Sequence, residues 1–177
     1  MRRRVLVRVV IAGFLAIGGA NARASEQTVQ TSDETRSAQW FGGWAIVGTW
    51  TVQIALVNCQ TGEEIPGATF PGLNTFLAEG SMLSDPASNP ALLRTGHGVW
   101  AHAGGRRFTN TVVLFRFNPD GTFAGTQTVR RNITVSRNSD EFTAHDTVTT
   151  ADPSGTVVDT RCGIGRARRL QSQSSSH

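Results

Sequence analysis

Two oppositely charged residues interrupt apolar strand faces in the C-terminal half of the chain. Arg131 falls on the apolar face of a period-2 segment, 122–136, and Asp146 falls on the apolar face of the next one, 141–151. If a four-residue loop joins the two segments, these side chains lie directly opposite each other. An inward charge is unfavourable unless it is paired. We therefore expect an interior ion pair, which either fixes the strand register or, with Gln127 beside it, forms the polar floor of a ligand site.

A histidine between two glycines is a second candidate site. The stretch TGHGVW contains His97 and, three residues later, Trp100. Either these side chains contact a ligand at the mouth of the fold, or His97 bonds a neighbouring backbone group in a tight strand entry. His102 and His145 are expected to be surface residues on their strands. The histidines do not have the spacing of a zinc motif, so we expect no metal site.

The two cysteines, Cys59 and Cys162, lie near the two ends of the expected folding unit. In an exported protein, an even pair without CxxC spacing favours a disulfide over a catalytic thiol or a metal site. Strand alternation puts Cys59 on the face opposite to Trp50. A bulge or the strand end would have to turn Cys59 for the bond to form.

The central part of the chain is rich in Thr, Val and Phe and has turn signals at regular intervals. The sequences NPDG, NSD and DPSG divide its C-terminal half into four strands. No segment has a convincing helical period. The eight expected strands cover residues 50–58, 73–78, 81–84, 96–103, 107–117, 122–136, 141–151 and 156–166.

Eight strands joined mostly by short turns favour an all-β fold, a single up-and-down antiparallel β-barrel, because closure removes exposed edges. A two-sheet β-sandwich is the alternative. We expect 50–56 to point its tryptophan and aliphatic residues inward, and 122–136 to have an inward face from Phe123 to Val135. The longer loop 85–95, which contains two prolines, is expected to cover one mouth of the barrel.

The N-terminus has the features of a secretory signal peptide. Four arginines precede an apolar run, and the small residues Ala22 and Ala24 stand where a signal peptidase would cut. The run is too short to span a bilayer comfortably, so we expect no stable membrane anchor. The expected organisation is a signal peptide over 1–24, a disordered leader over 25–39, one domain over 40–170 and a disordered tail over 171–177.

Removal of the signal peptide changes the charge of the protein. The chain has 17 basic and 13 acidic residues, and five of the arginines lie within 1–24. The remaining 12 basic and 13 acidic residues give a net charge of −1, so the basic precursor does not indicate nucleic-acid binding. The protein is expected to be secreted or periplasmic.

The two ends of the domain resemble those of the calycin superfamily, the lipocalin-like barrels. A G-x-W motif, Gly48-Thr49-Trp50, opens the first strand, and the last strand ends in arginines, including Arg168 and Arg169. The resemblance implies that one of these arginines covers Trp50 at the closed end. It also implies haem ligation through His97 as a minor possibility beside our expectation of no cofactor. The chain also resembles small secreted bacterial proteins of unassigned function.

These features favour a non-enzymatic barrel that binds a small, mostly apolar molecule in its interior. The sequence contains no G-x-S-x-G, P-loop or dinucleotide motif. An enzyme similar to allene-oxide-cyclase-like barrels is the second hypothesis, and a solid interaction protein without a cavity is the third. A cavity separates the first two from the third, and convergent ionisable groups on its wall would favour the enzyme.

Overall fold

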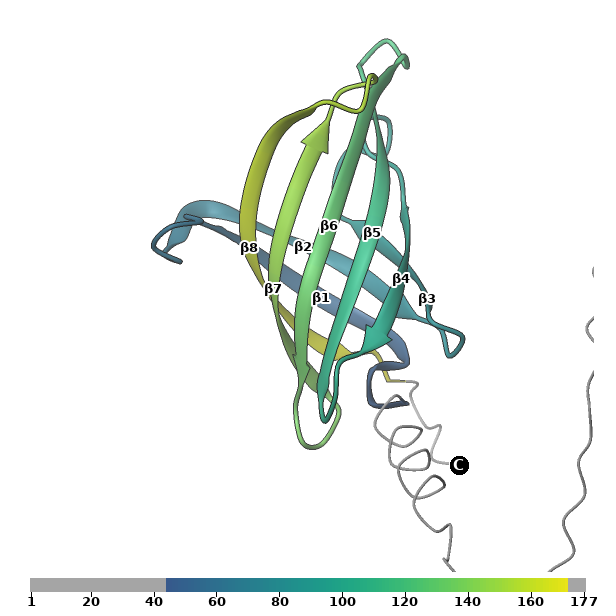
Figure 1. Cartoon of the computed structure of the whole chain (residues 1–177), viewed down its shortest axis with the longest axis vertical. Coiled ribbons are helices and arrows are strands. Elements are labelled where there is room, and N and C mark those ends of the chain that lie inside the picture. Colours follow the sequence, from purple (N-terminus) through teal and green to yellow (C-terminus); the bar gives the residue numbers. More distant parts are fainter. Residues whose placement is uncertain (1–43, 172–177) are drawn as a thin grey trace, which may run out of the picture. The chain divides into compact units, whose positions relative to one another are not determined.

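The computed structural model describes residues 44–171, in which eight antiparallel strands follow a single 3-10 turn, η1 (Trp44–Ile46) (Figure 1). The strand β1 pairs with β2 on one side and with β8 on the other, which closes a barrel in chain order. The expected all-β up-and-down barrel is confirmed, and the sandwich alternative is wrong. The strands are β1 (Gly48–Val57), β2 (Glu64–Phe76), β3 (Ser81–Pro86), β4 (Gly96–His102), β5 (Arg107–Phe117), β6 (Phe123–Val135), β7 (Glu141–Ala151) and β8 (Val157–Arg169).

Several expectations about the chain ends fall outside residues 44–171. They are the signal peptide over 1–24, the leader over 25–39, the domain start at 40–43, and the tail after Gln171. These stay predictions. Between Trp44 and Gln171, the structure has no helix with the length and apolar character needed to cross a bilayer.

The hairpins from β5 to β8 form where the turn residues predicted them. Asp120 Oδ1 accepts a hydrogen bond from the backbone nitrogen of Thr122 at 2.9 Å, and Asp152 Oδ1 accepts one from that of Thr156 at 3.0 Å. Such bonds satisfy loop donors locally. Strands β5 and β7 occupy the expected residues, and β8 runs three residues further than expected, to Arg169.

Strand β2 is longer than the sequence predicted. We expected a strand from residue 73, but β2 begins at Glu64. The expectation was wrong because the added stretch contains two prolines and two glycines, which are typical of a turn. The carbonyl of Pro71 accepts a hydrogen bond from the nitrogen of Ala87 at 2.9 Å, on the β3 side. In an antiparallel strand, the N–H and C=O of one residue point the same way. The missing N–H of Pro71 therefore removes no bond to β1.

The inward faces of β1, β7 and most of β6 agree with the expected alternation. Phe123 is a correction, because it was expected inward and is 44% exposed. The register of β5 and β6 shifts between Arg116 and Phe117, and Gly125 has a φ of 109° beside this shift. This bulge turns Phe123 outward, where its ring packs against Phe115 and Phe117.

Trp50 closes one end of the barrel. Its side chain is fully buried, and its Nε1 donates a hydrogen bond to the carbonyl of Ile46 in η1 at 2.8 Å. The ring centroids of Trp50 and Phe142 are 4.9 Å apart. The guanidinium of Arg169 lies 4.2 Å from the centre of the Trp50 ring, a cation–π contact. The expected covering of Trp50 by an arginine of the last strand is confirmed.

Arg169 also connects three segments at this end. Its Nε donates to the carbonyl of Ser139 at 2.7 Å, its Nη1 to that of Val47 at 2.5 Å and its Nη2 to that of Ala45 at 2.6 Å. The guanidinium thus ties η1 and the β6–β7 loop to β8. Arg168, the other expected candidate, is exposed and forms an ion pair with Glu141.

The disulfide between Cys59 and Cys162 is confirmed, with a Cα–Cα distance of 5.2 Å. Trp50 and Arg169 are an inward pair of β1 and β8, and Cys162 is seven residues before Arg169, paired with Val57. Alternation therefore places Cys162 on the outer face. Cys59 follows Val57 by two residues and keeps the same side. Both cysteines are outward, so the bond needs no turning of the strand.

Candidate functional site

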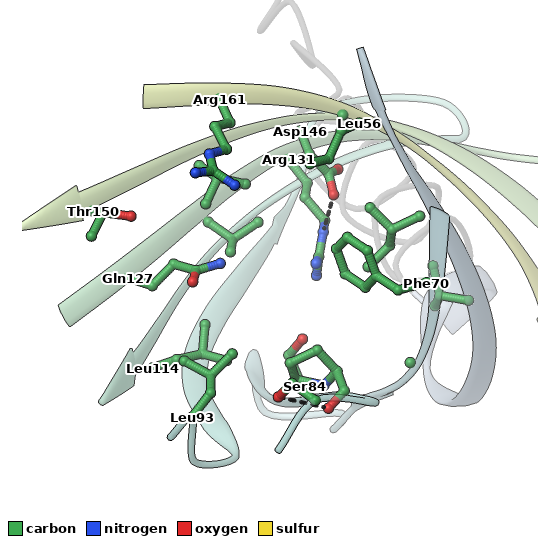
Figure 2. Close-up of a pocket in the computed structure, with 18 of the residues that line it drawn as sticks. Leu56, Phe70, Ser84, Leu93, Leu114, Gln127, Arg131, Asp146, Thr150 and Arg161 are labelled. Atoms are coloured by element: carbon green, nitrogen blue, oxygen red, sulfur yellow. Dashed lines mark hydrogen bonds and ion pairs between the residues drawn. The ribbon is translucent and has the colours of Figure 1, made fainter. Parts of the chain in front are cut away.

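A cavity of about 440 Å³ lies beyond Trp50 along β1, where Val52, Ile54 and Leu56 line it. Figure 2 shows side chains that line this cavity. The fully buried rings of Trp50, Phe76 and Phe142 pack the other end and do not line the cavity. Most of the wall surface is apolar, and its larger apolar side chains come from β1, β2, β5, β6, β7, β8 and the loop after β3. These residues are Val52, Ile54, Leu56, Phe70, Leu93, Leu114, Val129, Val148 and Val158.

The ion pair of Arg131 and Asp146 lies on the cavity wall. The two residues are register partners on β6 and β7, and Arg131 Nε donates to Asp146 Oδ2 at 3.0 Å. Arg131 is 5% exposed and Asp146 is 4% exposed. Figure 2 shows the guanidinium of Arg131 directed toward the carboxylate of Asp146. The expected interior pair is confirmed.

A polar chain extends from this pair across the barrel to β2 and β3. With the amide of Asn74 oriented to suit its neighbours, its oxygen accepts from Arg131 Nη1 at 3.3 Å and its nitrogen donates to Ser84 Oγ at 2.8 Å. Asn74 and Ser84 are both buried and are register partners. The four side chains form one polar floor beneath the apolar wall, and we call Asp146, Arg131, Asn74 and Ser84 the polar floor.

Asp146 has one oxygen that is not hydrogen-bonded. Its Oδ1 is buried and has no hydrogen-bond partner among residues 44–171. Burial raises the pKa of Asp146, and the nearby charge of Arg131 opposes this effect. The carboxyl group is therefore less well stabilised as an anion than an exposed one.

The open side of the cavity contains further polar groups. Arg161 and Asp159 on β8 form an exposed ion pair, with Nε and Oδ2 2.7 Å apart. Arg116 on β5 also lines the cavity and has no ion pair within the described part of the chain. Together with the polar floor, the lining has three arginines and two aspartates, a net charge of +1. Gln127, which was expected beside the ion pair, lines the same cavity but is not part of the polar floor.

The structure does not bring His97 and Trp100 to the cavity. Gly96 and Gly98 face inward, and a Cβ atom at Gly96 would lie 2.5 Å from a methyl group of Val112. His97 therefore points outward and is exposed. The two glycines are required by packing, and the position of His97 does not support haem ligation inside the barrel. Between residues 44 and 171, no group of three His, Cys, Asp or Glu side chains is placed to hold a metal ion.

Trp100 is a packing residue of the closed half. Its ring contacts those of Phe76 and Phe108, with centroids 6.4 and 5.9 Å away. Its Nε1 donates to the carbonyl of Leu77 at 2.9 Å. This contact ties β4 to the end of β2, which is a structural role.

The loop after β3 forms part of the wall. Leu93 forms a bridge with Arg116, and the nitrogen of Phe117 donates to the carbonyl of Leu92 at 2.9 Å. The loop thus runs along the end of β5 and contributes Leu93 to the cavity (Figure 2). This is the loop that was expected to cover one mouth of the barrel.

Sequence reasoning missed Phe70, Asn74, Ser84 and Arg116. The alternation of β2 could have identified Phe70 and Asn74, but its prolines and glycines hid that strand. Arg116 is in phase with the buried residues of β5, a signal that was present in the sequence. Ser84 has no distinguishing signal, because a lone serine at a strand end is common.

Comparisons with known proteins give limited information. No protein-family model matches the chain, and no curated protein matches it. Among solved structures, it is similar to the S-type phycobiliprotein lyase CPES from Guillardia theta, with 12% sequence identity and a TM-score of 0.37. The match covers 76% of this chain and 98% of that one. Because the similarity is so low, we draw nothing from it about ligand or activity. The closed eight-stranded barrel and the Trp50–Arg169 contact themselves fit a calycin-type barrel.

Proposed function

We propose that this protein binds a small, mostly apolar molecule inside its barrel. The observation that carries the proposal is the cavity of about 440 Å³, whose surface is mostly apolar, with polar side chains at its floor and at its open side. Sites for small molecules typically have this volume and this composition. Burial of a ligand against such a wall is favourable by about 25 cal/mol per Å² of apolar surface.

The cavity argues against the solid-barrel alternative. A barrel used only as an interaction surface needs no interior space, and cavities in a core lower the stability of a protein. The space is bounded by residues of seven strands, all except β4, and of the loop after β3. Ligand binding would explain why the barrel keeps this space despite its cost in stability.

The proposal places the protein outside the cytoplasm. The disulfide between Cys59 and Cys162 is consistent with an oxidising compartment such as the periplasm or the extracellular space. Export is also supported by the sequence of the N-terminus, which has the arginines, the apolar run and the Ala22-Arg23-Ala24 site of a signal peptide. N-terminal sequencing of the protein from its host tests this: a start at Ser25 supports export, and an intact Met1 on cytoplasmic protein would contradict it.

Fluorescence of N-phenylnaphthylamine, an apolar dye that brightens in dry pockets, tests binding in the cavity. Val129→Phe adds a ring to a wall position that is 5% exposed, and Val113→Phe makes the same change on the outer face of β5, where Val113 is 41% exposed. We expect saturable dye binding, at least tenfold weaker in Val129→Phe and unchanged in Val113→Phe. Circular dichroism checks that both variants fold. Equal dye binding by both would place the dye outside the cavity and overturn the proposal.

A second candidate is an enzyme that converts the molecule in the cavity. The observation in its favour is Asp146, a buried carboxyl group with a raised pKa beside a guanidinium on the cavity wall. Mass spectrometry of host extracts incubated with the wild type and with Asp146→Asn tests it. A product made by the wild type and not by the variant would favour the enzyme, and identical ligand masses would leave binding alone.

A further inference from the structure

The polar floor has more hydrogen-bond donors than acceptors. Arg131 has five N–H groups, of which Nε bonds Asp146 and one on Nη1 bonds Asn74. Its Nη2 has no hydrogen-bond partner within residues 44–171. Three N–H groups of a side chain that is 4% exposed therefore remain for whatever occupies the cavity.

The acceptors near this guanidinium are already used. Asp146 Oδ2 and the oxygen of Asn74 both accept from Arg131, and Asp146 Oδ1 is covered by protein. Ser84 Oγ accepts from Asn74, so its own hydroxyl proton is left to be donated. A ligand group at the polar floor must therefore accept hydrogen bonds, and a group that has to donate one finds few acceptors there.

The charge of the floor decides which acceptor fits. Asp146, 3.0 Å from Arg131, neutralises the guanidinium. A carboxylate at the same place would put a second negative charge beside one positive charge in a buried site, which is unfavourable. A neutral oxygen meets the donors of Arg131 without that penalty.

We propose that the polar floor recognises a neutral carbonyl oxygen, so that the ligand is an apolar molecule with an ester, ketone or aldehyde group rather than a free acid or an alcohol. This inference rests on the proposed function, because it needs a ligand in the cavity. Arg131 is the residue that contacts the carbonyl, and Asp146 sets the preference by neutralising Arg131. Ser84 is the second donor.

Displacement of N-phenylnaphthylamine by methyl nonanoate, decanoic acid and decanol near neutral pH tests the inference. The ester and the acid are isomers, so they differ in charge and not in atomic composition. We expect methyl nonanoate to bind about tenfold more tightly than either of the others. Equal binding of ester and acid, or tighter binding of the acid, in the wild type would overturn the inference.

Asp146→Asn is the decisive variant. It keeps the shape of the side chain and leaves the charge of Arg131 unneutralised, so we expect decanoic acid to gain about tenfold while methyl nonanoate changes by less than about threefold. Arg130→Met is the matched control, because Arg130 is exposed on the outer face of β6 and does not line the cavity, and it should change neither value. If the acid binds through Arg116, its affinity falls in Arg116→Met and does not rise in Asp146→Asn, which would contradict the inference.

A second variant keeps the test decisive if Asp146→Asn does not fold. Replacing the pair by Arg131→Met and Asp146→Leu removes the donors and the charge together. We expect dye binding to persist while methyl nonanoate loses about tenfold. An unchanged ester affinity would refute the role of Arg131. Failure of the wild type to bind the dye at all would instead refute the proposed function, so the two failures are distinct.

Discussion

Arg131 and Asp146 face each other across β6 and β7, with Nε and Oδ2 3.0 Å apart and both side chains at most 4% exposed. The other ion pairs between residues 44 and 171 have side chains that are 41–81% exposed. Desolvation opposes a buried pair as strongly as Coulomb attraction favours it, so such a pair is weak evidence of stability. Its position on the wall of a cavity instead suggests a role in recognition.

The first prediction concerns the coupling of this pair. Arg131→Met and Asp146→Leu should each lower the free energy of unfolding by about 3–5 kcal/mol, because each leaves one buried charge without its partner. The double variant should be nearly as stable as the wild type, because two apolar side chains replace the pair. Urea unfolding of the four proteins measures the coupling as a double-mutant cycle.

An exposed pair provides the control for this cycle. Arg166 and Glu64 are 2.7 Å apart, but their side chains are 58% and 48% exposed. The same cycle on that pair should give a coupling below about 1 kcal/mol. If the losses at Arg131 and Asp146 simply add, the two residues do not act as a pair, and the polar floor is not the unit described above.

The second prediction concerns the disulfide. Unreduced protein should have no reactive thiol, because Cys59 and Cys162 are bonded. Reduction, or the double change Cys59→Ala and Cys162→Ala, should lower the free energy of unfolding by about 4 kcal/mol in the chain-entropy model, since the cysteines are 103 residues apart in sequence. Thiol titration and thermal melting measure the two effects. Two reactive thiols in native protein would contradict the bond.

The sequence predicted the parts of this fold that local chemistry determines. The turns after Asn118 and Asp152 are set by residues within the turn, and the loop between Ser136 and Glu141 then fixes which residues of β6 and β7 are opposite. Arg131 and Asp146 could therefore be paired by counting from the loop. Gln127 followed from the same alternation.

The parts that escaped prediction depend on distant contacts. Asn74 meets Arg131 only because closure of the barrel brings β2 and β6 to the same interior, 57 residues apart in sequence. The stretch of β2 with two prolines looks like a turn in the sequence. In the structure the missing N–H of Pro71 is on the side away from β1, so this proline is compatible with a strand. His97 was chosen for its chemistry, but its neighbours Gly96 and Gly98 are small to make room for Val112, which turns the histidine outward.

The third prediction is a pH dependence with an unusual sign. Burial raises the folded-state pKa of Asp146 above its ordinary value of 3.8. Between that value and the raised one, the folded state binds more protons than the unfolded state, so stability falls as the pH rises through this window. The melting temperature of the wild type minus that of Asp146→Asn should therefore decrease as the pH rises upward from about 4.

Asp152 is a control with the opposite sign. The hydroxyl of Ser154 lowers the pKa of this exposed carboxyl group, so its contribution is present above the ordinary pKa and is lost as the pH falls through the lowered one. The difference between the wild type and Asp152→Asn should thus increase with pH below about 4 and stay constant above it, where the difference for Asp146→Asn decreases. The same trend for both variants would show that the environment of Asp146 does not set its titration.

The last prediction concerns the closed end, where Arg169 covers Trp50. Trp50→Ala should lower the free energy of unfolding by about 3–5 kcal/mol, because it removes a fully buried indole ring. Arg169→Ala should lower it by about 2 kcal/mol, because three carbonyls of η1 and the neighbouring loops lose their charged donor. Arg169→Lys should restore little of this, since one ammonium group cannot reproduce the forked contacts of a guanidinium.

Arg168→Ala is the matched control, because its side chain is 81% exposed and its ion pair with Glu141 should contribute below about 1 kcal/mol. Urea unfolding measures all four variants. A Trp50→Ala protein as stable as the wild type would show that this contact does not close the barrel, and it would remove the main support for the resemblance to calycin-type barrels.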